Sequence, residues 1–522
     1  MKQEVDLIVT NGNIYTINDS FEIVESFAVH NKRIVAIGSS FSILNNYNSK
    51  TILDVKGKTI FPGFIDAHCH FYGLGLTLQQ VNLVGTKSFE EVVEKIVLFQ
   101  EKNPSEYIKG RGWNQNDWKI KEFPTKEKLD KLFPYTPVAI NRIDGHAMLA
   151  NQKALDLANI NVNTKISGGE TIIKDGKLTG VLIDNAMNLV FKTMPKPTKD
   201  MQTKALQEAE KVCFSNGLTT VSDAELGRET VELMEEIHKK EELKIRIYTM
   251  ILATEKSLAY YLPKGPFKTD RLSVNAIKFY IDGALGSKGA YLKNNYLNTS
   301  KNGILVNSEE KFLEVAKRVK NSGFQLNVHA IGDKANEIVL KTFVDKLKIK
   351  KERRWRVEHA QIIAQEDFKY FATIMPSVQP THATSDMYWA EKLLGKKRLK
   401  GAYAYKDLLS KYGQIALGTD FPIEKVNPFL TFYSAVARKD TKQYPKNGFQ
   451  IENALTREET IKGMTIWAAY SNFEENEKGS IELGKFADFI IIDKDIMKIE
   501  IDEVLKTKVL ATYVGGKIVY EI

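Results

Sequence analysis

The chain has 522 residues, of which 43% are hydrophobic and 27% are charged, as in a soluble globular protein of roughly two to four domains. Its formal net charge of +9 arises from 74 basic and 65 acidic residues that are interspersed throughout the sequence. This even spread, without an arginine-rich tract, argues against a nucleic-acid-binding surface.

Two cysteines, Cys69 and Cys213, are too few for a disulfide framework and are typical of a reducing compartment. No stretch approaches the roughly 20 apolar residues needed to span a bilayer, and the N-terminus has no signal-peptide core. We therefore expect a cytoplasmic protein that has no membrane or nucleic-acid partner.

Both ends of the chain alternate apolar and polar residues in the manner of β-strands. The N-terminal segment contains DLIVTNGNIYTIN and ESFAVHNKRIVAIG, and the C-terminal segment contains KFADFIIIDKD and VLATYVGGKIVYEI. We expect residues 1–58 and 477–522 to pair into one small β-sandwich domain.

Residues 59–476 contain eight short apolar runs, most of them followed by an amphipathic stretch, and this alternation predicts an α/β fold with a (β/α)8 TIM barrel. The runs are TIFPGFIDAH, GLTTVSDA, KIRIYTMI, NAIKFYIDG, FQLNVHAIG, WRVEHAQI, ATIMPSVQP and GQIALGTD. The interval after the first run is too long for one helix. We therefore expect an inserted subdomain at about residues 84–200, lying over the mouth of the barrel.

In such a barrel the catalytic groups lie at the C-terminal ends of the strands. Six candidate ligands are at or near these ends: His68, His70, Lys278, His329, His359 and Asp420. Residues two apart on a strand face the same side, so His68 and His70 can share a metal ion, whereas Cys69 faces away. A single buried histidine is more often a core residue. Four at equivalent depths favour a metal site, because each would otherwise need its own hydrogen-bond partners.

Lys278 lies in the apolar run NAIKFYIDG, where an unpaired ammonium would be costly. One interpretation pairs this lysine with a carboxylate such as Asp282. The interpretation that we favour is a lysine whose pKa is depressed and which reacts with carbon dioxide. The resulting carbamate is an anionic ligand that can bridge two cations.

The order of these ligands resembles that of two-metal members of the amidohydrolase superfamily. Further motifs resemble its amidohydrolase family 3 branch, which includes N-substituted formamide deformylase: GRGWNQNDW, INRIDGHAMLAN, IKFYIDGALGSKGA, NVHAIGDKAN, RVEHAQ, SVQPTHATSD and LGTDFPIE. The resemblance extends over essentially the whole chain. It implies that His68, His70 and Asp420 hold one divalent ion, that His329 and His359 hold a second, and that N-carboxylated Lys278 bridges them. Zinc suits these ligands, as do iron, manganese, cobalt and nickel.

The expected activity is hydrolysis of a carbon–nitrogen bond other than a peptide bond, in an N-acyl or N-formyl amine, by a metal-activated hydroxide. Asp420 would accept the proton of the water and deliver it to the leaving amine, and His146 and His382 would stabilise the oxyanion or orient the substrate. Alternatives within the superfamily are a deaminase or cyclic amidase, and a lactone or phosphotriester hydrolase. A non-catalytic binding relative is disfavoured because all six ligand positions are filled.

Other residues have two interpretations. Arg111 is expected to bind either a substrate carboxylate or an acidic neighbour in the insert, and Trp113 either lines a substrate pocket or packs in a core. His238 lies in a charged helix and is expected at the surface. The expected partner is a small-molecule substrate, and a homodimer is the usual state in the superfamily.

Overall fold

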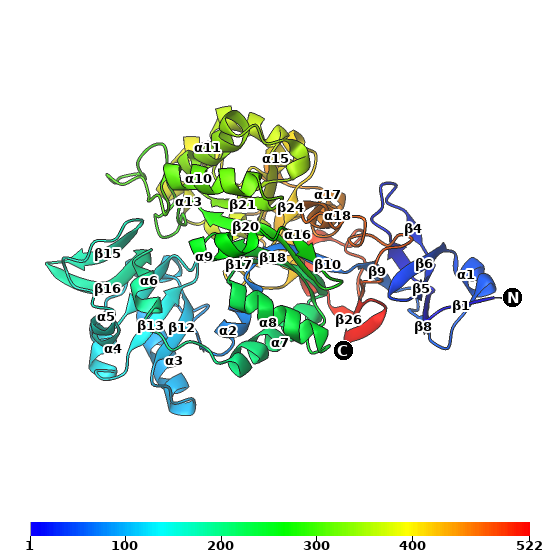
Figure 1. Cartoon of the computed structure of the whole chain (residues 1–522), viewed down its shortest axis with the longest axis horizontal. Helices are drawn as coiled ribbons and strands as arrows, with labels where there is room; N and C mark the ends of the chain where they lie inside the picture. The colour runs from blue at the N-terminus through cyan, green and yellow to red at the C-terminus, as the bar shows by residue number, and fades with distance from the viewer. Residues whose placement is uncertain (1) are drawn as a thin grey trace.

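The computed structural model describes residues 2–522, and a nearly closed barrel of parallel strands lies at its centre (Figure 1). Each strand pairs in parallel with the next one in this order: β10 (Phe64–Cys69), β17 (Leu218–Leu226), β18 (Arg246–Leu252), β20 (Leu272–Tyr280), β21 (Gln325–Ala330), β22 (Arg356–His359), β23 (Met375–Val378) and β24 (Ala416–Leu417). At the C-terminal ends of the strands, backbone bonds of 2.8 Å from Asp420 N to His68 O and from His70 N to Phe421 O join the last strand to the first. The predicted α/β barrel is confirmed.

Amphipathic helices surround the barrel and pack their apolar faces on the strands. In α10 (Glu309–Lys320) the buried residues are Phe312, Val315, Ala316 and Val319, which have the i, i+3, i+4, i+7 spacing of a single helix face. Ser308 caps this helix by accepting a hydrogen bond from Lys311 N, and two glutamates occupy its first turn, where the helix dipole favours negative charge. Other helices between the strands are α7 (Lys199–Ser215), α8 (Arg228–Lys239), α9 (Glu255–Tyr261), α11 (Asp333–Lys341) and α15 (Tyr405–Tyr412).

One histidine of these helices does not lie where the sequence indicated. His238, at the end of α8, was expected at the surface, but it is buried and its Nε2 lies 3.0 Å from the carbonyl oxygen of Ile245. That expectation was wrong, because the charged residues of α8 cover only one of its faces and His238 lies on the other.

Strands from the ends of the chain form two further sheets, and the two ends meet in the second of them (Figure 1). One sheet has the order β6 (Arg33–Gly38), β5 (Ser26–His30), β2 (Leu7–Thr10) and β8 (Ile52–Asp54). The other has the order β27 (Lys517–Glu521), β26 (Val509–Val514), β25 (Phe489–Ile492), β9 (Thr59–Pro62), β3 (Asn13–Tyr15) and β4 (Ile23–Val24). Side chains from both sheets, including Val9, Phe27, Ile60 and Phe489, form one apolar cluster between them.

The apolar run TIFPGFIDAH contributes to two different sheets. Its first half, β9, pairs with β3 and β25, whereas its second half, β10, pairs with the barrel strand β17. The change occurs at Gly63, where an added Cβ would lie 2.2 Å from the Thr219 side chain. By strand pairing, residues 59–62 therefore belong with the terminal sheets, although the sequence placed them in the barrel.

The segment between β10 and β17 contains a separate mixed sheet. Its strands are β11 (Val81–Asn82), β12 (Ile108–Trp113), β13 (Val138–Arg142), β14 (Ala147–Ala150), β16 (Lys177–Asp184) and β15 (Gly169–Lys174). Four helices accompany the sheet: α3 (Phe89–Lys102), α4 (Glu127–Leu132), α5 (Gln152–Leu157) and α6 (Met187–Phe191). We call residues 81–191 the insert. It lies at the opposite end of the molecule from the N-terminal strands (Figure 1). Within residues 2–522, no helix is long and apolar enough to cross a bilayer.

Candidate metal centre

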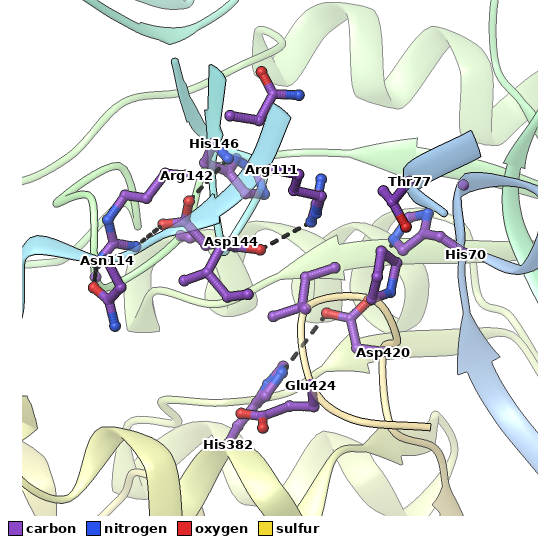
Figure 2. A pocket seen from close by; sticks show the side chains of 18 of the residues that line it. His70, Thr77, Arg111, Asn114, Arg142, Asp144, His146, His382, Asp420 and Glu424 are labelled. Atoms are coloured by element: carbon purple, nitrogen blue, oxygen red, sulfur yellow. Dashed lines mark hydrogen bonds and ion pairs between the residues drawn. The ribbon is translucent and has the colours of Figure 1, made fainter. Parts of the chain in front are cut away.

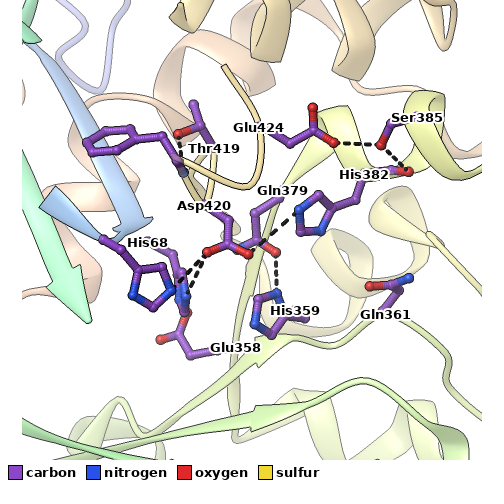
Figure 3. A network of polar contacts seen from close by, with 12 residues as sticks. His68, Glu358, His359, Gln361, Gln379, His382, Ser385, Thr419, Asp420 and Glu424 are labelled. Atoms are coloured by element: carbon purple, nitrogen blue, oxygen red, sulfur yellow. Dashed lines mark hydrogen bonds and ion pairs between the residues drawn. The ribbon is translucent and has the colours of Figure 1, made fainter. Parts of the chain in front are cut away.

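Six side chains from five barrel strands converge at the C-terminal ends of those strands. Nε2 of His68 lies 3.6 Å and Nε2 of His70 lies 3.2 Å from Oδ1 of Asp420. Nζ of Lys278 lies 3.2 Å from Nε2 of His68. The ring of His359 lies 4.9 Å from that of His68 and 4.6 Å from that of His329, between centroids. The structure thus brings all six predicted ligands together, and Figure 3 shows the side of this cluster around His68, His359 and Asp420.

The donor atoms of this cluster fit divalent cations. Ligand atoms of His68, His359 and Asp420 lie within 4.8 Å of one another, and all three residues are buried. Nε2 of His329 is buried without a hydrogen-bond partner among residues 2–522, and the buried Oδ1 of Asp420 faces the Nε2 atoms of His70 and His68. Burial lowers the pKa values of His329 and His359 well below the ordinary value, which keeps both imidazoles neutral and able to bind a metal. Imidazole nitrogens with carboxylate oxygens are ligands that zinc and related metals prefer.

Two polar side chains hold the histidine rings in place. Oε2 of Glu358 lies 2.6 Å from Nδ1 of His68, and Oε1 of Gln379 lies 2.8 Å from Nδ1 of His359 (Figure 3). Each contact leaves the Nε2 atom of the ring free to face the cluster. The sequence prediction missed both residues, although Glu358 directly precedes His359 and Gln379 directly follows the seventh barrel strand.

Lys278 is fully buried and does not pair with Asp282. Asp282 accepts hydrogen bonds from the backbone nitrogens of Tyr291, Ile331 and Gly332 instead, and so joins the loops after β20 and β21. Burial lowers the pKa of Lys278 to about 8, which increases the neutral amine fraction that can react with carbon dioxide. Asp282 is therefore not the partner of Lys278, and the carboxylates whose charge acts most strongly on this lysine are Glu358 and Asp420.

A cavity of about 1120 Å³ lies between the metal-ligand cluster and the insert. His70 and Asp420 of the barrel line one side, and Arg111, Arg142 and His146 of the insert line another (Figure 2). Lys278 and His329 of the barrel also line the cavity. This volume is at or slightly above the range of about 300–1000 Å³ that is usual for small-molecule sites. The insert therefore forms a wall of the same cavity that the barrel strands end in.

His146 and His382 both line this cavity, from opposite sides of the cluster. Nδ1 of His146 lies 2.6 Å from Oδ1 of Asp184, and the ring lies 5.2 Å from that of His329, between centroids. Nε2 of His382 lies 3.7 Å from Oδ2 of Asp420 (Figures 2 and 3). Both histidines are therefore within reach of a molecule bound at the cluster.

The two candidate substrate-binding residues have different environments. Arg111 lines the cavity. Trp113 is fully buried in the apolar core of the insert and donates a hydrogen bond from Nε1 to the carbonyl oxygen of Ile140. The structure therefore corrects the assignment of Trp113: its side chain packs the insert, and it is not among the residues that line the cavity in the described part of the chain.

Glu225 and Tyr280 also line the cavity, and the sequence prediction missed them. The hydroxyl of Tyr280 donates to Oε2 of Glu225 over 3.1 Å, and the Tyr280 ring lies 5.0 Å from that of His329, between centroids. Tyr280 lies two residues after Lys278 on β20, and this spacing was the available signal. Glu225, His359 and Asp420 have positive φ values of 70°, 72° and 61°, a conformation that is costly outside glycine and that clusters at functional sites.

Comparison with known proteins agrees with this geometry. A model of the amidohydrolase family matches residues 51–520. The chain is 34% identical to protein LONG AFTER FAR-RED 3 of Arabidopsis thaliana, over 99% of this chain and 91% of that protein. It is 25% identical to the N-substituted formamide deformylase of Arthrobacter pascens, over 100% and 99% of the two chains. The crystal structure of an uncharacterized metal-dependent hydrolase from Pyrococcus furiosus superposes with a TM-score of 0.74 and 28% identity, covering 94% of this chain and 100% of that one.

Proposed function

Because the chain belongs to the amidohydrolase family of metal-dependent hydrolases, we propose that it cleaves a carbon–nitrogen bond other than a peptide bond, in an amide-like substrate such as an N-acyl or N-formyl amine. The observation that carries the proposal is the convergence of His68, His70, Lys278, His329, His359 and Asp420 on one side of the cavity. Similarity to a formamide deformylase over the whole chain favours the amide bond among the bonds that such a centre hydrolyses.

The proposed centre contains two divalent ions, which we assign as zinc. His68, His70 and Asp420 would hold one ion, His329 and His359 would hold the other, and N-carboxylated Lys278 would bridge them. When bound, the pair of ions supplies a water of lowered pKa and polarises the substrate carbonyl. Burial of the ligands suits this role, because the low dielectric strengthens the electrostatic interactions within the site.

Three residues of the chain carry the proton and orientation steps of the proposal. Oδ1 of Asp420 is buried and lies 3.2 Å from Nε2 of His70, and we assign to Asp420 the role of accepting the proton of the attacking water and passing it to the leaving nitrogen. Nε2 of His382 lies 3.7 Å from Oδ2 of Asp420, and Nδ1 of His146 lies 2.6 Å from Oδ1 of Asp184. Each of these rings presents Nε2 for a hydrogen bond to the substrate carbonyl or its oxyanion.

A substrate panel tests the proposal. The chelator-treated and zinc-restored protein is assayed with N-formyl amines, N-acyl amines, dipeptides, cyclic amides, aminopurines, lactones and phosphotriesters. Zinc-dependent release of amine from the formyl or acyl amines is expected. Preferred turnover of a cyclic amide or an aminopurine would assign a different substrate class that is also cleaved at a carbon–nitrogen bond. Preferred turnover of a dipeptide, lactone or phosphotriester would assign a different bond to the same centre. Zinc-restored protein that turns over none of these classes would contradict the proposal.

A further inference from the structure

Arg111 on β12 lines the cavity, and its guanidinium group has few hydrogen-bond partners within the protein. Its Nη2 donates to the carbonyl oxygen of Ile143 over 2.9 Å, and its Nε is buried without a hydrogen-bond partner. No carboxylate lies within 4.0 Å of the guanidinium in the part of the chain that the structure describes. Burial also lowers the pKa of Arg111 from its ordinary value, and the charges of Asp144, Asp420 and Glu225 offset this effect only in part, so the group bears a net cost of desolvation.

Arg142 on the adjacent strand β13 differs from Arg111 in its hydrogen bonding. All three of its nitrogens are bonded: Nε donates to Gln115, Nη1 to Asp144 and Nη2 to Asn114 (Figure 2). Both arginines line the same cavity wall, yet only Arg142 has the set of partners that a structural arginine requires. Arg142 therefore stabilises the cavity wall, whereas N–H donors of Arg111 are available to bind a ligand.

Asp144, the carboxylate whose charge acts most strongly on Arg111, already has other partners. Oδ2 of Asp144 pairs with Arg142, and Oδ1 accepts the backbone N–H of His146 over 3.1 Å. Gly145 follows, with a φ of +75°, and a Cβ there would lie 3.3 Å from both terminal nitrogens of Arg111. The turn thus packs closely against the guanidinium, but Asp144 forms its ion pair with Arg142 and not with Arg111.

We propose that Arg111 is a specificity-determining residue that binds a carboxylate carried by the substrate, on the part of the molecule that extends from the metal centre into the insert. This inference rests on the proposed hydrolase function and names its substrate class as anionic amides. An arginine presents two parallel N–H donors that match the two oxygens of a carboxylate. A cavity of about 1120 Å³ also has room for more than a small formamide.

The inference is tested by ligand binding to the metal-loaded full-length protein. The probes are matched pairs that the enzyme cannot hydrolyse: phenylacetate with 2-phenylethanol, 4-phenylbutyrate with 4-phenylbutanol, and hexanoate with hexanol. Calorimetry is expected to show at least one acid binding about 10- to 100-fold more tightly than its alcohol, as expected for a charge-assisted hydrogen bond. In Arg111→Met this preference for the acid is expected to vanish. In Arg111→Lys, which keeps the positive charge but lacks the paired N–H donors of a guanidinium, only part of the preference is expected to remain.

Lys109→Met is the matched control, because Lys109 lies on the same strand but its Nζ donates to the carbonyl oxygen of Pro195, and it does not line the cavity in residues 2–522. This variant is expected to keep the full preference for acids. If no acid binds the wild-type protein more tightly than its alcohol, or if the preference persists in Arg111→Met, the inference is overturned. Unchanged unfolding temperatures of the variants would show that they are folded. Because the experiment measures binding and not turnover, its result does not depend on whether the protein cleaves a carbon–nitrogen bond.

Discussion

Oε2 of Glu358 lies 2.6 Å from Nδ1 of His68, and both side chains are completely buried. The contact spans the barrel, from the sixth strand to the first, and directs Nε2 of His68 towards Lys278 and Asp420. Arg356 compensates the charge of Glu358 through an ion pair of 2.9 Å. A carboxylate behind a histidine ligand fixes the tautomer of the ring and makes its metal-binding nitrogen more basic.

Replacing this carboxylate should weaken metal binding without removing a ligand. In Glu358→Gln the affinity for zinc is expected to fall about 10- to 100-fold, because a neutral amide supports the imidazole less strongly. Competition against a chromophoric chelator measures the change. Glu352→Gln serves as the control, because Glu352 is exposed and lies outside the site. Equal zinc affinities for Glu358→Gln and the wild type would show that Glu358 only balances the charge of Arg356.

Removal of Lys278 tests the bridging carbamate. Lys278→Ala is expected to lose activity and part of its zinc, because the site then lacks the anionic oxygen ligand between the two positions. Short carboxylates such as acetate or propionate should restore part of both, since the deleted side chain leaves room for a molecule of that size. Acetamide and propionamide are the neutral controls. A fully active Lys278→Ala protein with two zinc ions per chain would rule out the bridge.

The positions of the ligands follow from local sequence rules, whereas their supporting contacts do not. Residues two apart on β10 face the same side, and the barrel topology brings the ends of its strands to one face, so His68, His70 and His329 could be placed from sequence. Glu358 is separated from His68 by 290 positions and meets it because β22 and β10 are strands of the same nearly closed barrel. Such distances across a barrel depend on strand tilt and stagger, which apolar patterning does not encode.

The sequence also predicts which segments form strands better than it predicts which strands pair with one another. Eight apolar runs predicted the barrel because buried parallel strands are continuous in their hydrophobicity. The division of TIFPGFIDAH between two sheets could not be predicted, because β9 and β10 form one continuous run of buried residues and differ in the strands with which they pair. Trp113 was ambiguous for a related reason. A tryptophan two residues after an arginine can line a pocket or pack in a core, and the register shift of β12 against β13 between Arg111 and Trp113 could not be predicted from the sequence.

Trp113 should therefore affect stability and leave substrate binding unchanged. Trp113→Phe removes the donor to the Ile140 carbonyl inside the insert core, which should cost about 1–3 kcal/mol. We expect a lower unfolding temperature together with an unchanged KM. Arg111→Met provides the contrast, with altered ligand binding and little change in unfolding temperature. A raised KM for Trp113→Phe at a normal unfolding temperature would return Trp113 to the substrate pocket.

The junction between the terminal sheets and the barrel should make the protein sensitive to acid. Asp488, next to β25, accepts hydrogen bonds from Nε and Nη2 of Arg246 over 2.5 and 2.9 Å, and both side chains are buried. Burial alone would raise the pKa of Asp488, but the charge and hydrogen bonds of Arg246 hold it below its ordinary value. A carboxylate with a lowered pKa in the folded state stabilises the fold above its unfolded pKa of about 3.9, and this contribution is lost as the pH falls through the folded pKa.

Asp488→Asn is expected to lower the free energy of unfolding by about 3–5 kcal/mol at pH 7, because the buried Arg246 loses its counter-charge. The difference from the wild type should persist down to about pH 4 and shrink below it, since protonation then removes the same charge from the wild-type protein. Urea unfolding at pH 7, 5 and 3.5 measures both values. Asp19→Asn, an exposed carboxylate, provides the control for general charge effects. If the difference between Asp488→Asn and the wild type stayed constant across this range, the stabilisation would come from packing at the junction rather than from the charge of Asp488.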